Sequence, residues 1–389
     1  MLRFCASPAE GSAGPLRHPL TPPLHYATTR LLPSPWRRRR SKAAWKEMRS
    51  ASRSCSVAPF TGERNDMQRP SDTLAGGIAL ITMGTLLAAP TIADNLAARL
   101  GHPAEARLVI LHADDLGMCH AANEAFLEMH RAGLVKCGSI MVPCPWFPEI
   151  AAFCREHPDH DLGVHLTLTS EWKYYRWRPV APATEVPGLL DEEGFMWHDE
   201  RQVVEHATPK EVETEIRAQI ALARKFGVEP THLDSHMGTL FSSAQFFEVY
   251  LRVAKEENLP PMIPRVSPEL LAQYGLTDFR YEPIEQAGYL VLDALNLGVE
   301  GDTLETRFEA YREALQALPP GVSQIILHPA KDGPELSNIA GSHVKRDLDY
   351  RLMLLPEMRD LLKELKLQSV GYRELWPLWE KGAGKPRGQ

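Results

Sequence analysis

From about Arg107 onward, short apolar segments alternate with longer amphipathic ones, and this alternation constrains the fold more than any other feature of the sequence. Short apolar runs with β-branched residues indicate buried strands, and apolar residues spaced three or four positions apart indicate helices. The predicted strands cover residues 108–113, 136–143, 161–168, 230–236, 261–266, 322–330 and 369–375. The predicted helices cover residues 123–133, 146–157, 208–227, 243–258, 303–318 and 345–366.

Strands that alternate with helices predict a parallel sheet covered by helices, which is an α/β fold. A count of about seven strands favours an irregular (β/α) barrel over an open sheet. No internal repeat and no second domain is visible, so we expect one domain over residues 94–380 and a flexible tail over 381–389. In such folds the chemistry lies at the carboxyl ends of the strands.

Polar residues that can bind a metal or move a proton lie at the ends of four predicted strands. Core packing does not require His or Asp at these places, and a barrel would bring all four strand ends to one face. The residues are Asp114 and Asp115 after LVILHA, His165 in GVHLTLT, His232, Asp234 and His236 in THLDSH, and His328 in IILHPA.

Each residue also has a structural interpretation when it is taken alone. A carboxylate after a strand often caps the next helix, although capping explains at most one of Asp114 and Asp115. A single His such as His165 is more often a hydrogen-bonded core residue than a ligand. The spacing of His232 and His236 is short and common, and His328 could bond a neighbouring loop. Only the placement of all these residues at strand ends of one sheet indicates a functional site.

One carboxylate and two imidazoles form a facial set that holds a divalent ion and leaves positions open for water and substrate. Such an ion lowers the pKa of bound water and polarises a carbonyl oxygen. A second carboxylate can act as a base toward that water, and a separate His can protonate a leaving nitrogen. This chemistry explains two adjacent aspartates, because the cation offsets their repulsion and keeps the base ionised.

The segments ADDLGMCHAANEA, GVHLTL, THLDSH and ILHPA, in that order, resemble the YdjC family of carbohydrate deacetylases, which includes chitooligosaccharide deacetylases. The resemblance covers about residues 106–376. That family is similar to the NodB-type polysaccharide deacetylases, which share an irregular (β/α) barrel and metal-assisted hydrolysis of N- or O-acetyl groups. The resemblance implies a hydrolase that acts on an acetylated carbohydrate, with an N-acetylated oligosaccharide as the expected substrate.

The resemblance also implies roles for single residues. It makes Asp115, His165 and His236 the metal ligands; Mg²⁺ is the ion usually assigned, and Zn²⁺ suits this donor set at least as well. By analogy with the NodB-type enzymes, Asp114 is the base and His328 the acid. The remaining candidates line the site, support the ligands or orient the base, and they are His232, Asp234 and Arg265.

The segment EWKYYRWRPV after His165 is rich in aromatic and basic residues. Trp172 could stack on a sugar ring and Arg178 could hold hydroxyl or carboxylate groups. The alternative is a packed lid without direct substrate contact. Chitooligosaccharide deacetylases usually continue HLDSH with further histidines, whereas this chain reads HLDSHMGTLF, so a chitin-type substrate is not implied.

Two other functions remain open on the sequence alone. One is a different metal-dependent hydrolase on the same barrel, for example one that cleaves phosphate esters; the absence of a Gly-rich phosphate-binding loop after any strand argues mildly against it. The other is a carbohydrate-binding protein that has lost turnover, against which both proton-transfer candidates, Asp114 and His328, are still present.

The first 93 residues differ from the rest. Residues 1–66 hold 12 basic and 4 acidic residues, a balance of +8 in a chain of net charge −7, and we expect a disordered, Pro-rich extension or a mis-assigned start. Residues 67–93 resemble a signal peptide that starts at Met67, which predicts a periplasmic or secreted protein; otherwise the protein is cytoplasmic. We expect no nucleic-acid partner and no stable membrane anchor, and a homodimer remains open.

Overall fold

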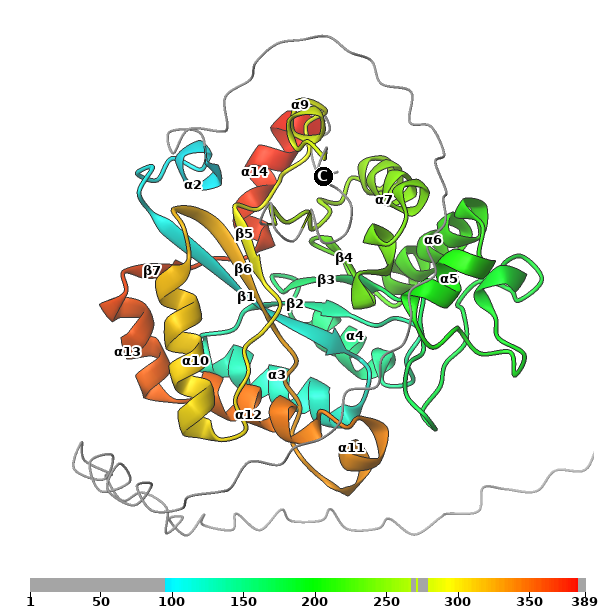
Figure 1. Ribbon diagram of the computed structural model, residues 1–389, viewed down its shortest axis with the longest axis horizontal. Coiled ribbons are helices and arrows are strands. Elements are labelled where there is room, and N and C mark those ends of the chain that lie inside the picture. The colour runs from blue at the N-terminus through cyan, green and yellow to red at the C-terminus, as the bar shows by residue number, and fades with distance from the viewer. Residues whose placement is uncertain (1–94, 267–270, 272–278, 384–389) are drawn as a thin grey trace, which may run out of the picture. The chain divides into compact units, whose positions relative to one another are not determined.

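Seven parallel strands form the centre of the described part of the chain (Figure 1). The computed structural model describes residues 95–266, 271 and 279–383. Each strand pairs with its neighbours in parallel, as expected when helices connect consecutive strands. The strands are β1 (Arg107–Leu116), β2 (Cys137–Ile140), β3 (Asp161–Leu166), β4 (Leu233–Ser235), β5 (Ala294–Asn296), β6 (Gly321–Leu327) and β7 (Leu367–Ser369).

The longest strand, β1, is the middle of the sheet. The strand order is β4-β3-β2-β1-β6-β5, and β7 also pairs with β1. Strand β6 pairs with residues 107–113 of β1. On the other edge of β1, β7 pairs with residues 107–109 and β2 pairs beyond residue 112. Nine of the ten residues of β1 are buried, so this strand places its carboxyl end inside the protein.

The segment between β4 and β5 connects these two edge strands of the sheet through single β-bridges. Leu233 of β4 forms a parallel bridge with Pro261, and Pro264 forms one with Leu292, just before β5. The predicted strand over 261–266 is therefore present only as isolated bridges, because prolines at three positions of PPMIP remove ladder donors. The predicted irregular (β/α) barrel with about seven strands is confirmed.

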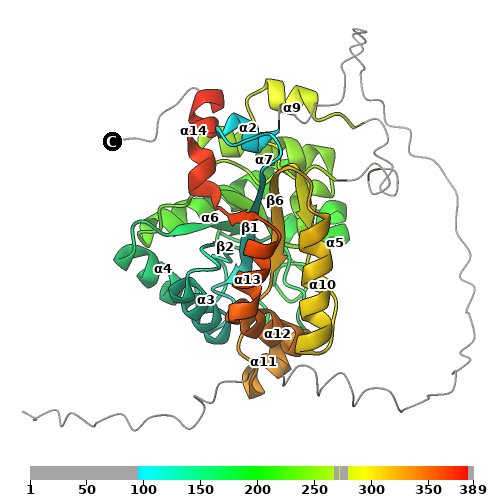
Figure 2. The same ribbon diagram turned by 90° about the vertical axis from the view of Figure 1, so that its left-hand side faces the viewer.

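Helices surround the sheet in both views (Figures 1 and 2). In Figure 1, α10, α12 and α13 lie on one side of the strands, and α5, α6 and α7 lie on the other. The helical elements are α2 (Leu96–Arg99), α3 (His120–Ala132), α4 (Phe147–Glu156), η2 (Pro187–Leu189), α5 (Glu200–His206), α6 (Pro209–Lys225), η3 (His236–Phe241), α7 (Ala244–Glu256), α9 (Glu282–Gln286), α10 (Leu304–Ala317), α11 (Pro334–Ile339), α12 (His343–Met353), α13 (Pro356–Glu364) and α14 (Tyr372–Ala383).

The structure corrects three predicted elements. The helix predicted over 345–366 is two helices, because Pro356 begins α13 and the residue before it, Leu355, is extended. Strand β5 was not predicted, since three residues of ordinary composition carry no periodic signal. Of the predicted strand 369–375, only Ser369 belongs to β7, and Tyr372 begins α14.

Helix α6 shows how local sequence fixes an element beside the site. The Thr208 hydroxyl accepts a hydrogen bond from the Glu211 N–H, and the Glu211 carboxylate accepts one from the Thr208 N–H. This capping box, with Pro209 in the first turn, starts the helix where the sequence predicts it. The helix then packs beside α7 and beside β3, whose carboxyl end holds His165.

The four cysteines in the described part of the chain are free and buried: Cys119, Cys137, Cys144 and Cys154. Burial raises the pKa of each thiol. In this structure these cysteines are therefore core thiols.

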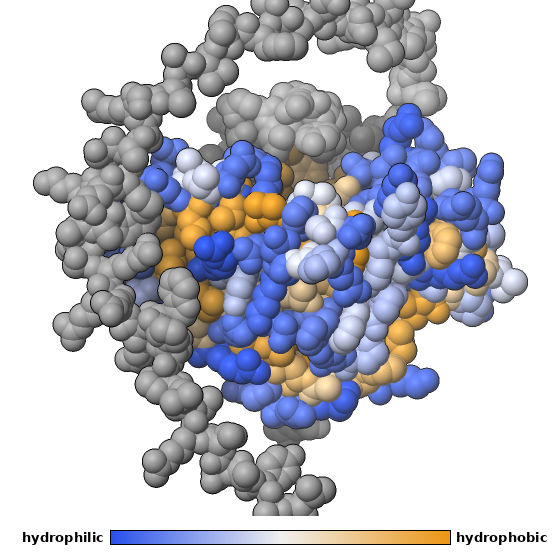
Figure 3. Space-filling view, turned by 90° about the horizontal axis from the view of Figure 1, so that it is seen from below, coloured by the Kyte–Doolittle hydropathy of each residue, from blue (hydrophilic) through white to orange (hydrophobic). Residues whose placement is uncertain are grey.

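The face seen in Figure 3 is largely hydrophilic, with hydrophobic residues reaching the surface in separate groups. Within the described ranges, no helix combines the length and apolar character needed to cross a membrane. The predictions for residues 1–66 and 67–93, and for the tail beyond 383, fall outside the described residues and stay predictions, as does the homodimer.

Candidate metal centre

The two consecutive aspartates lie inside β1 and not after it, and a local change in the backbone brings both to one site. In a regular strand, neighbouring side chains point to opposite faces. Asp115 has a φ of 63°, in the left-handed region that a non-glycine residue rarely adopts, and the pairing of β1 with β2 shifts register between Ala113 and Leu116. Asp114 Oδ2 lies 3.9 Å and Asp115 Oδ1 3.4 Å from the same atom, His165 Nε2.

Three ligand-type atoms from three strand ends form a nearly equilateral triangle. Asp115 Oδ1 lies 3.4 Å from His165 Nε2 and 3.3 Å from His236 Nδ1, and the two ring nitrogens are 3.2 Å apart. All three side chains are buried. Asp115 Oδ1 has no hydrogen-bond partner in the described structure, although a buried carboxylate oxygen normally has one.

These spacings fit a divalent cation. Ligand atoms about 2.0–2.2 Å from a cation, at tetrahedral or octahedral angles, lie about 2.8–3.6 Å from one another. The distances among Asp115, His165 and His236 fall in this range. The three residues predicted as ligands are thus brought together at positions that a cation would join.

Asp234 supports His165 from the side away from the triangle. The Asp234 Oδ2 atom lies 3.1 Å from His165 Nδ1 and also accepts a hydrogen bond from Ser139 Oγ. A carboxylate on Nδ1 fixes the tautomer that leaves Nε2 free to bind a metal. Burial by itself would raise the pKa of Asp234, but His165 holds it well below its usual value, so this carboxylate stays ionised.

His236 has a carboxylate partner as well, namely Glu171. Both Glu171 carboxylate oxygens lie 3.2 Å from His236 Nε2. The residue after His236, Met237, has a φ of 55°, so the chain turns sharply as it leaves β4 and aims the imidazole back at the triangle. Burial lowers the pKa of His236, yet Glu171 and Asp115 together raise it to about 9.

Arg346 of α12 holds the other oxygen of Asp115. Its Nη2 atom donates to Asp115 Oδ2 at 2.7 Å, and both side chains are buried. Burial would raise the pKa of the Asp115 carboxyl, but Arg346, followed by His165 and His236, holds it well below its usual range. Asp115 is therefore anionic, and one of its oxygens is directed at the triangle.

Asp114 occupies a separate position beside the triangle. Its Oδ1 atom lies 2.5 Å from Nδ1 of His112, which is two residues earlier on β1 and on the same face. The His112 Nε2 atom lies 2.8 Å from His232 Nε2, so the predicted site residue His232 reaches Asp114 only through His112. All three residues are buried.

His328 follows β6, directly beside the end of β1. Its backbone N–H donates to Asp349 Oδ2 of α12 at 3.3 Å, and Asp349 is paired with Arg307 of α10. The side chain is half-buried, and it contributes to the lowered pKa of Asp115. The structure therefore places this candidate acid at the same end of the barrel as the triangle.

The segment after β3 folds over this end of the barrel. Trp177 is buried, with its ring 6.5 Å from that of His236, and Trp172 packs 5.3 Å from Trp177. The guanidinium of Arg346 lies over the Trp172 ring at 5.8 Å. Tyr174 is 79% exposed. The segment is thus a packed cover whose aromatic residues adjoin the site.

Two predicted site residues are engaged elsewhere. Arg178 is exposed and stacks over Phe195 within its own loop, at 5.3 Å. Arg265 donates to Glu285 at 2.8 Å and lies 4.6 Å over the ring of Tyr281. In this structure both guanidinium groups contact other residues, and the predicted roles of Arg178 in sugar binding and of Arg265 in orienting the base stay predictions.

Three residues of the site were not predicted: Glu171, Arg346 and His112. Glu171 had a usable signal, since it follows GVHLTLTS and lies just beyond a strand end. His112 also had one, because it lies on the same face of a strand as Asp114. Arg346 had none, because it lies on a helix more than 200 residues from Asp115 and only the fold brings the two together.

This chain is similar to known proteins over most of the described residues. The family model described as YdjC-like protein matches residues 108–364, which is more than half of the chain. A carbohydrate deacetylase of Thermus thermophilus is 37% identical over 66% of this chain and 90% of its own length. A chitooligosaccharide deacetylase of Proteus mirabilis is 26% identical over 69% of this chain and 99% of its own.

A solved protein structure also matches most of this chain. The crystal structure of an Enterococcus faecalis protein, described as a cellobiose-phosphate cleavage protein, matches with a TM-score of 0.58 and 25% identity, over 69% of this chain and 99% of the other. The fold and the site define an α/β-barrel protein with a buried Asp-His-His centre. The chain belongs to the YdjC-like family.

Proposed function

We propose that this chain is a metal-dependent carbohydrate deacetylase that removes acetyl groups from an acetylated carbohydrate, with an N-acetylated oligosaccharide as the expected substrate. The observation that carries the proposal is the triangle of Asp115 Oδ1, His165 Nε2 and His236 Nδ1, with sides of 3.2–3.4 Å and an oxygen that lacks a hydrogen-bond partner in the described structure. The relatives named carbohydrate deacetylase support the activity.

The residues of the triangle would hold a divalent cation. A cation bound there would supply Lewis acidity, polarising the acetyl carbonyl and lowering the pKa of a water molecule. The family resemblance favours Mg²⁺, whereas one oxygen and two nitrogen donors suit Zn²⁺ at least as well. The carboxylates of Asp234 and Glu171 keep the two imidazoles oriented toward the triangle.

Asp114 would take the proton from the attacking water. Its Oδ2 atom lies 3.9 Å from His165 Nε2, so the carboxylate borders the triangle without being one of its corners. Its other oxygen is bound to His112. A carboxylate in this place can accept a proton as the carbon–oxygen bond forms at the acetyl carbon.

His328 would then give a proton to the leaving nitrogen. It follows β6, which pairs with the edge of β1 that β2 does not pair with, so it can approach the substrate from a direction different from that of Asp114. Its half-buried side chain allows contact with a bound substrate. Breakage of the C–N bond needs such an acid, because an amide nitrogen leaves poorly without a proton.

The cover over the site supports a sugar as the substrate. Aromatic rings stack on the apolar faces of sugars, and the ring of Trp172 lies against Trp177 and beside the Arg346 guanidinium, which holds Asp115. Trp146 is 38% exposed and lies against His120, at the start of α3, the helix that follows β1. Both rings can contact a glycan whose acetyl group lies at the triangle.

The proposal is tested by measuring metal content and acetate release on the same samples. The full-length protein is expected to bind one divalent ion per chain and to release acetate from a panel of acetylated oligosaccharides. Phosphate release and disaccharide cleavage from phosphorylated cellobiose form the comparison arm, because the Enterococcus faecalis protein is described by that reaction. Phosphate release in that arm, without acetate release, would replace the deacetylase proposal with the phosphoester alternative, and disaccharide cleavage alone would contradict both.

Two substitutions separate the ligand from the base. Asp115→Ala is expected to lose the metal and to reduce activity to background, since it removes one corner of the triangle. Asp114→Asn is expected to keep the metal and to lower kcat by about 10²–10⁴-fold, the range for loss of a general base. A fully active Asp114→Asn protein would show that Asp114 is not the base.

A further inference from the structure

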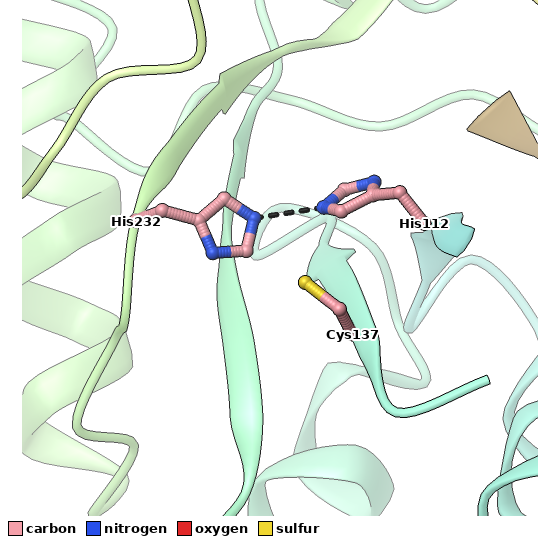
Figure 4. Close-up of side chains that lie close together, drawn as sticks. All are labelled: His112, Cys137 and His232. Carbon is pink, nitrogen blue, oxygen red and sulfur yellow. Dashed lines mark hydrogen bonds between the residues drawn. The ribbon is translucent and has the colours of Figure 1, made fainter. Parts of the chain in front are cut away.

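A second group of buried side chains lies behind Asp114, on the side away from the triangle. His112 Nδ1 lies 2.5 Å from Asp114 Oδ1, and His112 Nε2 lies 2.8 Å from His232 Nε2. This series of hydrogen bonds continues to Thr231, whose hydroxyl lies 2.9 Å from His232 Nδ1. Figure 4 shows the two imidazoles directed at one another, with His112 projecting from β1. None of these contacts involves the three corners of the triangle.

One assignment of donors and acceptors satisfies every hydrogen bond from Asp114 to Thr231. If the His112 Nδ1–H donates to the Asp114 carboxylate, His112 Nε2 is left as an acceptor for the His232 Nε2–H. His232 Nδ1 then accepts from the Thr231 hydroxyl. All four ring nitrogens have a partner, so the orientation of the Asp114 carboxylate is fixed by rings that are themselves fixed.

The surroundings leave the rings no other position. His112 and His232 are completely buried. The ring of Tyr372 stacks on His232 with centroids 3.8 Å apart and an 11° angle between planes. A Cβ atom on Gly163 would lie 2.6 Å from the His232 carbonyl oxygen and 2.7 Å from its ring, so glycine is needed for His232 to fit. The packing therefore fixes the position of the His232 ring, and the hydrogen bond between the two rings fixes that of His112.

We propose that His112 is a positioning residue for Asp114, that its Nδ1–H orients the carboxylate that takes the proton from water, and that His232 fixes His112 in the required tautomer. This inference rests on the proposed function, because it assumes that Asp114 is the base. A carboxylate held by one donor presents its other oxygen in a defined direction, here toward the triangle.

A metal site on the same residues is a competing interpretation. His112, Cys137 and His232 each offer a donor atom within 4.8 Å of the others, and the Cys137 sulfur points toward the two rings in Figure 4. Two imidazole nitrogens on a tetrahedral zinc ion, which two His and one Cys would suit, lie about 3.3–3.4 Å apart, whereas these two are separated by 2.8 Å, the distance of a hydrogen bond. The geometry therefore favours a hydrogen bond between the rings.

Two substitutions at His112 test the proposal, because each keeps one ring nitrogen. The amide nitrogen of Asn replaces Nδ1, so His112→Asn keeps the donor to Asp114 and loses the contact with His232. Gln replaces Nε2, so His112→Gln keeps the contact with His232 and loses the donor to Asp114. We expect kcat to fall by less than about tenfold for Asn and by about 10²-fold or more for Gln, with KM nearly unchanged in both.

The metal content of both variants is expected to stay at one ion per chain. Equal losses of kcat in the two variants, or a larger loss for Asn, would overturn the proposal. A second soft-metal ion in the wild-type protein that is lost on Cys137→Ser would overturn it too, in favour of the metal site. If the wild-type protein releases no acetate, the proposed function fails, and the hydrogen bond itself is then decided by spectroscopy.

The spectroscopic test needs no substitution at His112 and covers the case in which the variants do not fold. In ¹⁵N-histidine-labelled wild-type protein, His112 is expected to carry its proton on Nδ1, with a strongly downfield signal for the bond to Asp114. Asp114→Ala is expected to remove that signal while the ring signals of His165 and His236 persist. An unprotonated His112 Nδ1 would contradict the proposal whatever the enzyme's activity.

Discussion

At the scale of single residues, the site depends on one uncommon backbone conformation. Asp115 reaches the triangle because its φ of 63° turns its side chain out of the strand's alternation. Such a conformation costs of order 1–3 kcal/mol and persists only where the surroundings fix it. The ion pair with Arg346 provides that fixation, because it joins Asp115 to a helix from the other end of the chain.

Glu171 gives the first residue-scale prediction. Its carboxylate is bound to His236 Nε2, on the side of the ring opposite to the triangle. Loss of a carboxylate that orients a metal-bound His typically weakens the metal about 10–100-fold. We expect Glu171→Gln to weaken metal binding by this amount, with most activity restored at saturating metal, as measured by metal titration of the metal-free protein.

The matched control for Glu171 is Glu185→Gln. Glu185 belongs to the same loop and is exposed, so its substitution removes the same charge without touching His236. The control should leave metal affinity unchanged. If both variants weaken the metal equally, the effect is one of net charge, and Glu171 does not orient His236.

The sequence predicted the corners of the triangle better than their support. Asp115, His165 and His236 were among the His and Asp candidates at the predicted strand ends, and the resemblance to the YdjC family singled them out as the ligands. Arg346 was not, since its role is set by the packing of α12 against the end of β1 and no spacing in the sequence records that packing. The roles of Arg178 and Arg265, which were inferred from their places in a basic loop and at a predicted strand end, stay predictions.

At the scale of elements, the cover over the site is held together by Arg176. This buried guanidinium donates to Asp191 and to the Met196 carbonyl, and its Nε donates to Ser170. The contacts join the beginning of the loop to its far end. Trp177, the next residue, adjoins His236, so the order of the loop is linked to the shape of the site.

We therefore expect Arg176→Lys to loosen the cover. A lysine cannot make the forked set of hydrogen bonds, and the lost bonds to buried acceptors should lower the free energy of unfolding by about 1–3 kcal/mol. KM for the carbohydrate should rise more than kcat falls, because the catalytic residues are on other elements. Thermal unfolding and steady-state kinetics measure the two effects.

The control for Arg176 lies three residues earlier. Lys173 is exposed on the same loop, and Lys173→Ala should change stability and KM little. A fall in kcat with KM unchanged in Arg176→Lys would contradict the interpretation of the loop as a substrate cover.

Element boundaries were predicted well where local chemistry sets them and poorly elsewhere. Helix α6 begins at its capping box as predicted, since the cap residues are adjacent in sequence. The break at Pro356 has a local signal, because this proline lies inside the helix predicted over 345–366. Strand β5 could not be predicted, because its pairing with β6 and not its own composition makes it a strand.

At the scale of the whole molecule, the barrel topology assembles a site from residues that are far apart in sequence. The strand ends of β1, β3 and β4 supply the triangle, and α12 supplies the arginine behind it. Asp114, Asp115, Asp234 and Glu171 place four carboxylates around two imidazoles in a buried space. Positive charge must accompany them, and either protons on the imidazoles or a cation can provide it.

Binding of a cation at the triangle should displace protons from the imidazoles. Without a metal, Glu171 and Asp115 raise the pKa of His236 to about 9 against the lowering effect of burial. Because this pKa is above the value of about 6.5 in the unfolded chain, the proton stabilises the fold fully below pH 6.5. That stabilisation is lost as pH rises through about 9. Metal binding must displace the proton, since Nδ1 cannot hold both.

Metal affinity should therefore rise by up to about tenfold per pH unit for each proton displaced, between pH 6.5 and 9, and level off above. The metal-free protein should lose thermal stability across the same window, while the metal-loaded protein should not. Calorimetric titration at pH 7.5 in buffers of different ionisation enthalpy should detect release of at least about one proton per ion. A difference in Tm between the two forms that stays constant from pH 6.5 to 9 would show that the cation does not bind at His236.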